Sequence, residues 1–465
     1  MKSIYILLFL FLNATSIAQT VYPAPTGAWL NDDFSVYVRN TGCEWKPVDT
    51  YMIMVDQVRN AKHHVENASM AYFDFSGEVE IRIVNNKGEI DEARVRPLSY
   101  GISPVVEGRT LTFSLDRPCN LSVEINGDIF HNLHLFANPL EECIPRPTDT
   151  NDLIYFPPGF HHIDGDTLRI PSNTKVHVSG GAFIDGCILI DNAHNVTLTG
   201  RGIVRPEHKP GVIVSNSKNV VIEGIITTQC PVGGSDSVTV RNVKSITHYG
   251  WGDGLNVFAS SNVLFDNVFC RNSDDCTTVY GTRKGYKGPS RNILMRNSVL
   301  WADVAHPIFI GIHGDSETLE NLVYENIDIL DHAERQIDYQ GCLAINAGDD
   351  NLIHNVRFEN IRIEDFRQGQ LINLRIFYNK KYCRAPGRGI ENVLFKDISY
   401  NGTHANLSII TGYDEMRTIR NLRFENLRIN GQLISDDMPD KPAWYKTADM
   451  ANFFIGEHVD TPTFK

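Results

Sequence analysis

Three aspartates and one histidine carry the chemistry that this sequence suggests most directly. Asp274 and Asp275 are adjacent in the stretch NSDDC, Asp253 lies in GWGDG, and His306 lies in VAHP. Carboxyl groups held close together cannot all ionise easily, because repulsion and partial burial raise the pKa of at least one. A neutral carboxylic acid beside charged carboxylates is what glycosidic hydrolysis requires. An isolated Asp-Asp pair is ordinarily a solvated turn, so this interpretation depends on a fold that brings the four residues together.

A repeat predicts such a fold. The repeated unit begins with Asn, or once Ser, and continues with apolar residues at alternate positions. Its nine copies begin at Asn195, Asn219, Ser237, Asn262, Asn292, Asn321, Asn355, Asn392 and Asn421. Apolar residues with a period of two indicate strands. Units spaced by 18 to 37 residues favour an all-β fold, a right-handed parallel β-helix whose coils stack and whose loops vary in length. Asparagine tolerates the left-handed conformation of a tight corner, so we expect the heads of the repeats to form a ladder.

The heads of the repeats also serve as a ruler for the ionisable residues. Five ionisable residues lie 12 to 16 residues after the nearest preceding head: Asp253, Asp274, Asp275, His306 and Arg335. Neighbouring parallel strands lie about 4.7–4.9 Å apart, so residues in register form a column along the outer face. Both members of the Asp pair face outward only if the backbone bends there. We expect His306 to hydrogen-bond a carboxylate of the column.

The other segments predict the domain organisation. Residues 1–18 combine Lys2, an apolar run and small residues before Gln19, which is typical of a secretory signal cleaved near Ala18. The sequence therefore predicts a secreted or periplasmic protein. Residues 19–145 contain short alternating runs closed by turn residues, as in an antiparallel β-sandwich. We assign residues 150–431 to the β-helix and 432–465, where the repeat is lost, to a C-terminal cap.

The composition of the chain limits the classes of molecule that we expect it to bind. A formal net charge of −13 argues against a nucleic acid, because such binding depends on basic patches. No stretch after the signal approaches the roughly 20 apolar residues of a membrane span. The nine cysteines lack metal-type CxxC spacing, and we expect several to be buried as small apolar residues. We expect no cofactor and no metal ion, and the predicted partner is a polysaccharide or oligosaccharide substrate.

From about residue 25 to 430 the sequence resembles the inverting β-helix glycoside hydrolases that include polygalacturonases, dextranases and isopullulanases. WGDG and SDDC match the first two polygalacturonase motifs in their aspartates, AHP shares only His306 with the third, and the Arg-Ile-Lys motif is absent. The stretches RPLSYGISPVVEGRTLTFSLDRPCNLSVEINGD and VLWADVAHPIFIGIHGD look like the dextranase and isopullulanase family. The resemblance implies that Asp274 is the general acid, that Asp253 and Asp275 hold and deprotonate water, and that hydrolysis inverts the anomeric carbon.

Aromatic and basic residues near the column are candidates for sugar contacts. The aromatic candidates are Trp251, Tyr280, Trp301 and Tyr339, and the basic ones are Arg283, Lys284, Arg335 and Arg375. The sequence thus predicts a secreted, dextranase-like hydrolase of internal α-linkages in a polysaccharide. The alternatives are a polygalacturonase-type hydrolase of an anionic glycan, a polysaccharide lyase, and a non-catalytic glycan-binding solenoid.

Overall fold

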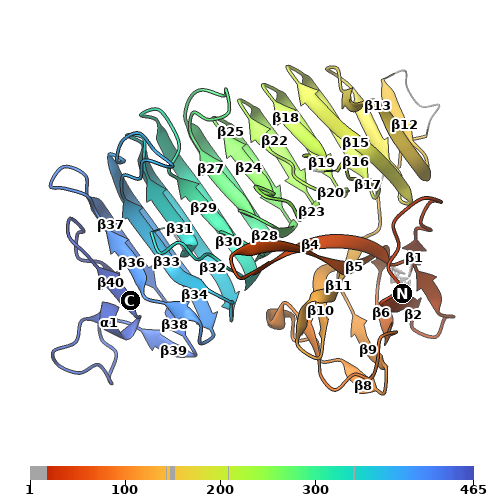
Figure 1. The fold of residues 1–465 in the computed structure, drawn as a ribbon, viewed down its shortest axis with the longest axis horizontal. Helices are drawn as coiled ribbons and strands as arrows, with labels where there is room; N and C mark the ends of the chain where they lie inside the picture. Colours follow the sequence, from red (N-terminus) through yellow and green to blue (C-terminus); the bar gives the residue numbers. More distant parts are fainter. Residues whose placement is uncertain (1–17, 143, 147–151, 208, 339–340) are drawn as a thin grey trace, which may run out of the picture.

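The fold is almost entirely β. The computed structural model describes residues 18–142, 144–146, 152–207, 209–338 and 341–465 (Figure 1). The predicted signal sequence, apart from Ala18, lies outside these residues. Within them, no helix is both long and apolar enough to cross a membrane. The eight cysteines in this part of the chain are all free, and all but Cys43 are buried, as expected.

The N-terminal part is a β-sandwich of two sheets. The six-stranded sheet contains β1 (Ala18–Val21), β4 (Tyr51–Arg59), β5 (Lys62–Ser76), β7 (Ala93–Arg96), β10 (Cys119–Ile125) and β11 (Asp128–Pro139). The five-stranded sheet contains β2 (Phe34–Asn40), β3 (Lys46–Val48), β6 (Val79–Asn85), β8 (Val105–Glu107) and β9 (Thr110–Leu115), and the 3₁₀ turn η1 spans Leu98–Tyr100. Buried and less buried residues alternate along strands such as β2 and β6, which places one row of side chains in the core. Pairings are antiparallel apart from β5 with β11.

The rest of the chain is the parallel β-helix that the repeat predicts, with three faces. The first face contains β12 (Leu153–Phe156), β14 (Lys175–Val178), β16 (His194–Gly200), β19 (Lys218–Glu223), β22 (Asp236–Arg241), β25 (Ser261–Asp266), β28 (Ser290–Ala302), β30 (Thr318–Asp331), β32 (Leu352–Glu364), β34 (Gly389–Asn401), β37 (Ile419–Glu425) and β41 (Thr463–Phe464). The second face contains β13 (Gly159–Arg169), β15 (Ala182–Asp191), β17 (Ile203–Val204), β20 (Ile226–Thr227), β23 (Lys244–Ile246), β26 (Phe269–Asn272), the later halves of β28, β30, β32 and β34, and β38 (Leu427–Ile429) with its antiparallel partner β39 (Gln432–Ile434).

The third face carries the candidate site. Its strands are the later halves of β13 and β15, then β18 (Val212–Ser215), β21 (Val232–Gly233), β24 (Leu255–Phe258), β27 (Thr277–Tyr280), β29 (Ile308–Gly311), β31 (Gly341–Ala347), β33 (Gly369–Ile376), β35 (Ala405–Asn406), β36 (Ser408–Thr411) and β40 (Phe453–Ile455). Inward-facing Val, Ile, Leu and Phe side chains from all three faces form one continuous core. The stacking of the coils therefore fixes which residues meet on the outer side of this face.

The C-terminal segment does more than cover the last coil. The short helix α1 (Thr447–Met450) precedes β40 and β41, which pair in parallel with β36 and β37. Phe464 stacks on Phe424 with ring centroids 4.7 Å apart. Residues beyond 431 thus close the end of the core and also add strands to it.

The expected asparagine ladder is confirmed. The head residues have φ between 52° and 60°. Successive asparagines are joined from side-chain nitrogen to side-chain oxygen at 2.7 to 3.2 Å. At Ser237 the ladder is interrupted, and Asn262 instead donates to the carboxylate of Asp236 at 2.7 Å. Apart from the coil of Ser237, one corner of each of these coils is therefore held by an asparagine side chain.

Asn321 offers a test of the ladder. Its φ is 57°, and its side chain donates to Asn292 and accepts from Asn355. We expect Asn321→Ala to lower the free energy of unfolding by about 1–2 kcal/mol, because alanine is strained in the left-handed region. Asn321→Gly removes the same side chain without that strain and should cost less. Denaturant unfolding of both variants checks this, and equal losses would contradict the role of the backbone conformation.

The sandwich packs against the second face of the β-helix. Aromatic and aliphatic residues of β4, β5 and β11 share a buried cluster with Phe183, Phe269 and Trp301. Two buried ion pairs cross the same interface, Arg201 with Asp74 at 2.9 Å and Arg96 with Glu364 at 2.7 Å. Figure 1 shows the hairpin β4–β5 extending from the sandwich along the β-helix toward its middle coils. The sandwich thus reaches the part of the chain that contains the candidate site.

Candidate active site

One column of side chains lies just before the strands of the third face. It contains Asp253, Asp275 and His306. Each lies two residues before a strand, namely β24, β27 and β29. These strands are paired in register, with Leu255 opposite Thr277 and Thr278 opposite Phe309. Backbone hydrogen bonds extend this register to the column. The amide of Gly254 donates to the carbonyl of Asp275 at 2.8 Å, and the amide of Cys276 donates to the carbonyl of His306 at 2.8 Å. The column derived from the repeat is therefore present on three of its four predicted coils.

The carboxylate of Asp275 is held by several donors. His306, which is 1% exposed, places Nδ1 at 2.6 Å and its backbone amide at 3.2 Å from Oδ1 of Asp275. The hydroxyl of Tyr280 donates to Oδ2 at 3.4 Å. Hydrogen bonds to an ionised group are stronger than neutral ones. The orientation of Asp275 is thus fixed before any substrate binds, and His306 has the expected role of carboxylate partner.

Asp253 and Asp274 remain partly exposed beside it. The side-chain amide of Asn256 donates to Asp253 at 2.5 Å, and the backbone amide of Asp275 donates to Oδ1 of Asp274 at 3.0 Å. Partial burial, followed by the charge of Asp275, raises the pKa of Asp253 to about 7. Burial, followed by the charges of Asp275 and Asp253, raises the pKa of Asp274 well above its usual value. At least one of the carboxyl groups therefore carries a proton near neutral pH.

Glu334 is a fourth acid that the sequence interpretation missed. Its side chain is buried, at 5% exposure. Glu334 follows Ala333, which forms an antiparallel bridge with Ala305, the residue before His306. Burial raises its pKa, Asp275 raises it further and His306 lowers it. Glu334 lies 13 residues after a repeat head, as does Asp275, but it lies in a loop inserted before β31, and the bridge between Ala305 and Ala333 rather than the register brings it to the column.

Glu334 predicts a shift in pH dependence. Its negative charge is one of the causes that raise the pKa of Asp274. Glu334→Gln removes that charge, so Asp274 loses its proton at lower pH. If Asp274 must be protonated to act, the alkaline limb of a kcat/KM profile moves to lower pH. Glu320→Gln, at a surface pair with His354, is the control and should leave the limb in place. An unmoved limb in Glu334→Gln would show that the two carboxyl groups are not coupled.

Cationic and aromatic groups surround the column unevenly. Trp251 is 85% exposed and lies two residues before Asp253. Arg283 lies over the ring of Tyr280, 4.7 Å from its centroid, and the charges of Arg283 and Lys284 lower the pKa of Asp253. The ring of Tyr280 is buried, at 4% exposure, so it is closed to sugar stacking and its hydroxyl serves Asp275 instead.

Other predicted contacts lie elsewhere. Trp301 is buried in the sandwich interface, where Arg271 lies over its ring, because it belongs to the second face. Arg335 does not extend the column. A loop is inserted before β31, so that Gly341 takes the position in register with His306, and the guanidinium of Arg335 instead donates to the carbonyl of Val58 at 3.1 Å. Arg375 pairs with Asp338 at 3.0 Å. Tyr339 lies outside the described residues.

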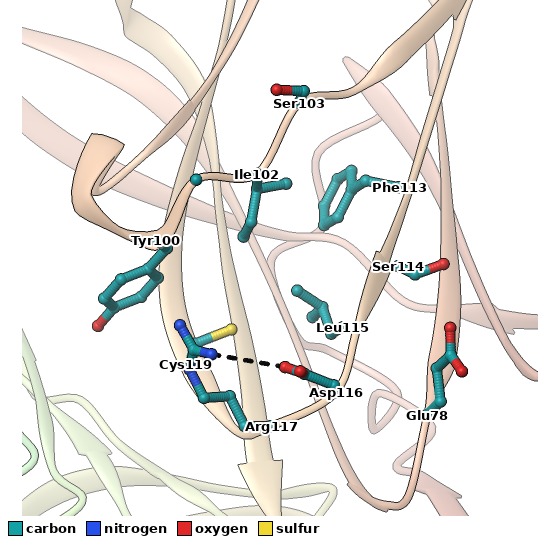
Figure 2. Close-up of a pocket in the computed structure, with 11 residues that line it drawn as sticks. Glu78, Tyr100, Ile102, Ser103, Phe113, Ser114, Leu115, Asp116, Arg117 and Cys119 are labelled. Carbon is teal, nitrogen blue, oxygen red and sulfur yellow. Dashed lines mark ion pairs between the residues drawn. The ribbon is translucent and has the colours of Figure 1, made fainter.

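A cavity in the sandwich lacks the clustered carboxyl groups of the column. It has a volume of 350 Å³ and lies between the segment after η1 and strands β9 and β10. Figure 2 shows Tyr100, Ile102 and Phe113 around it, with Asp116 facing Arg117 in an ion pair of 3.6 Å. None of the predicted site residues lines it. The coupled carboxyl groups of the column are found on the third face.

The parallel β-helix, with Asp274 and Asp275 adjacent at the entrance to its third face, agrees with the fold that the resemblance to β-helix glycoside hydrolases implies. Comparison with protein families agrees, since residues 158–438 match glycosyl hydrolases family 28. The chain belongs to that family.

Individual relatives are distant. A probable endopolygalacturonase D from Neosartorya fischeri is 23% identical over 223 residues, which cover 47% of this chain and 43% of that protein. The chain thus spans less than half the length of this curated relative. Dex49A from Penicillium minioluteum matches with a TM-score of 0.61 and 12% identity over 95% of this chain and 96% of its own. A family 28 exopolygalacturonase from Yersinia enterocolitica has a TM-score of 0.48 at 13% identity, over 83% of this chain and 97% of its own. The likeness to Dex49A covers both the sandwich and the β-helix and concerns the fold alone.

Proposed function

We propose that this chain is an exported hydrolase that cleaves α-linkages within a polysaccharide and inverts the anomeric configuration. The observation that carries the proposal is the column of carboxyl groups on neighbouring coils, in which burial and mutual repulsion raise the pKa of Asp253 and of Asp274. Such a cluster supplies a neutral acid and a base at the same pH. Membership of a glycoside hydrolase family supports the same reaction class.

In the proposed mechanism Asp274 is the general acid. It donates its proton to the glycosidic oxygen as the bond from that oxygen to the anomeric carbon breaks. Asp253 and Asp275 hold a water on the opposite side of the sugar ring. The water oxygen bonds to the anomeric carbon and its proton passes to this pair. His306 and Tyr280 act as positioning residues, because both bond Asp275. One water is consumed and two sugar chain ends are formed.

A panel assay tests this function. Dextran, pullulan, polygalacturonate and a sulfated galactan are incubated with the protein, and new reducing ends are measured. We expect one polymer to be cut, and ¹H NMR of the fresh product to show a β-anomer, since inversion of an α-linkage gives that configuration. Absorbance from a new unsaturated bond would indicate a lyase. Retention of a polymer without reducing ends would indicate a binding solenoid.

A second candidate is a polygalacturonase-type hydrolase of an anionic glycan. The observation that favours it is the cationic pair Arg283 and Lys284, whose charges act on Asp253 in a chain with a net charge of −13. Positive groups beside a cleavage site favour binding of uronate carboxylates. Cleavage of polygalacturonate in preference to the neutral polymers would select this candidate.

Export is part of the proposal because of the signal-like residues 1–18. The expected result is that the protein recovered outside the cytoplasm begins at or near Gln19, as read by N-terminal sequencing. A protein that keeps Met1 and stays inside the cell would contradict it.

A further inference from the structure

A second cavity lies where the sandwich hairpin β4–β5 meets the β-helix. It has a volume of 350 Å³, within the range of about 300–1,000 Å³ that small-molecule sites occupy. The hairpin contributes Val58, Ala61 and His63, and the β-helix contributes three loops, residues 303–304, 333–336 and 367–368. Both domains are therefore needed to build it.

This cavity adjoins the acid column. The bridge between Ala305 and Ala333 ties together two of its loops, and His306 is the next residue along one of them. Glu334 lines the cavity and its carboxyl group interacts with the charges of His306 and Asp275. A sugar chain bound at the column thus has the cavity beside it.

The hairpin wall is held in place before any ligand binds. Nine antiparallel residue pairs run from Tyr51 opposite Met70 to Arg59 opposite Lys62. His63 lies 2.5 Å from the carboxylate of the buried Asp56, and Arg335 of the β-helix bonds the carbonyl of Val58. A preformed wall loses little conformational entropy on binding.

The chemistry of the lining suits a sugar. Asp303 is neutralised by Arg271 at 3.0 Å, and Arg367 is paired with Asp331 at 2.6 Å. The other polar residues of the lining are His63, Glu334, Arg335, Gln336 and Gln368. Their side chains carry donors and acceptors of the kind that sugar hydroxyl groups bond. We propose that this cavity is a sugar-binding subsite of the acid column, with the sandwich hairpin as one wall. The proposal rests on the function proposed above.

Chain-length dependence tests the subsite. Isomalto-oligosaccharides and oligogalacturonides of two to eight units are the probes, and kcat/KM is measured for each length. In the unmodified protein we expect kcat/KM to rise once the oligosaccharide reaches the cavity. His63→Ala and, from the opposite wall, Gln368→Ala should each reduce that rise by up to about tenfold, chiefly through KM, as expected for the loss of one hydrogen bond.

His64→Ala is the matched control, because neighbouring side chains on a strand point to opposite faces and His64 does not line the cavity. It should keep the unmodified length profile. Gln368→Ala leaves the hairpin intact, so it separates loss of the subsite from local unfolding around Asp56. Cleavage with the same length profile in all four proteins would overturn the subsite and leave the proposed function standing. Absence of cleavage of every probe and of the polymer panel would overturn both.

Discussion

Asp274→Asn is expected to lower kcat on the cleaved glycan by about 10²–10⁴-fold, the range that general acid catalysis contributes. Asparagine has the size of the aspartic acid and keeps an oxygen for the backbone amide of Asp275, which bonds Asp274 at 3.0 Å. It has no acidic proton to give to the leaving oxygen. KM should therefore change much less than kcat. Initial rates of reducing-end release over a range of polymer concentrations measure both.

Asp185→Asn is the control for this variant. Asp185 belongs to a coil nearer the N-terminus and makes a solvent-exposed pair with His162, so its rate should equal that of the unmodified protein. If Asp274→Asn also keeps the full rate while both variants unfold at the same temperature, the pair in NSDDC is a turn and the proposed mechanism is wrong.

Arg271→Ala is expected to destabilise the protein by about 3–5 kcal/mol, the cost of leaving a buried charge without its partner. The guanidinium is fully buried and bonds Asp303 at 3.0 and 3.2 Å. It also bonds Asn132 and the carbonyl of Ile129 in the sandwich, at 2.8 and 2.9 Å. The variant therefore weakens the β-helix and its interface together.

Denaturant unfolding of Arg271→Ala measures this loss. Arg296→Ala is the matched control, because Arg296 pairs with Asp266 at 2.9 Å but is 40% exposed, and exposed pairs contribute about 0–1 kcal/mol. An unchanged midpoint for Arg271→Ala would show that the interface does not depend on this arginine.

The β-helix could be predicted from sequence because its constraint is local and repeated. Each coil needs alternating apolar residues and a residue that tolerates positive φ at one corner, and both recur at the heads of the repeats. A second corner carries the same signature, with Asn297, Asn326 and Asn360 at φ of 53° to 55°. The packing of the hairpin β4–β5 against the β-helix was not predictable. The alternation of apolar and polar residues along a strand does not tell which distant surface the strand will contact.

The acid column was predictable for the same reason, since register follows from counting along coils. The ruler failed at Arg335, where a loop was inserted. Trp301 was misplaced for a different reason, because it belongs to another face of the β-helix. Tyr280 was misjudged because aromatic type alone does not distinguish an open ring from a buried one. The interaction of Glu334 with the column depends on a bridge between two loops, which no period in the sequence encodes.

The most direct measurement is a crystal structure of Asp274→Asn with an oligosaccharide of the cleaved glycan. We expect a glycosidic oxygen within about 2.6–3.2 Å of the side chain at position 274, with a water on the opposite side of the sugar ring in contact with Asp253 and Asp275. Sugar bound only elsewhere, for example in the sandwich cavity of Figure 2, with the column empty, would show that these aspartates do not form the active site.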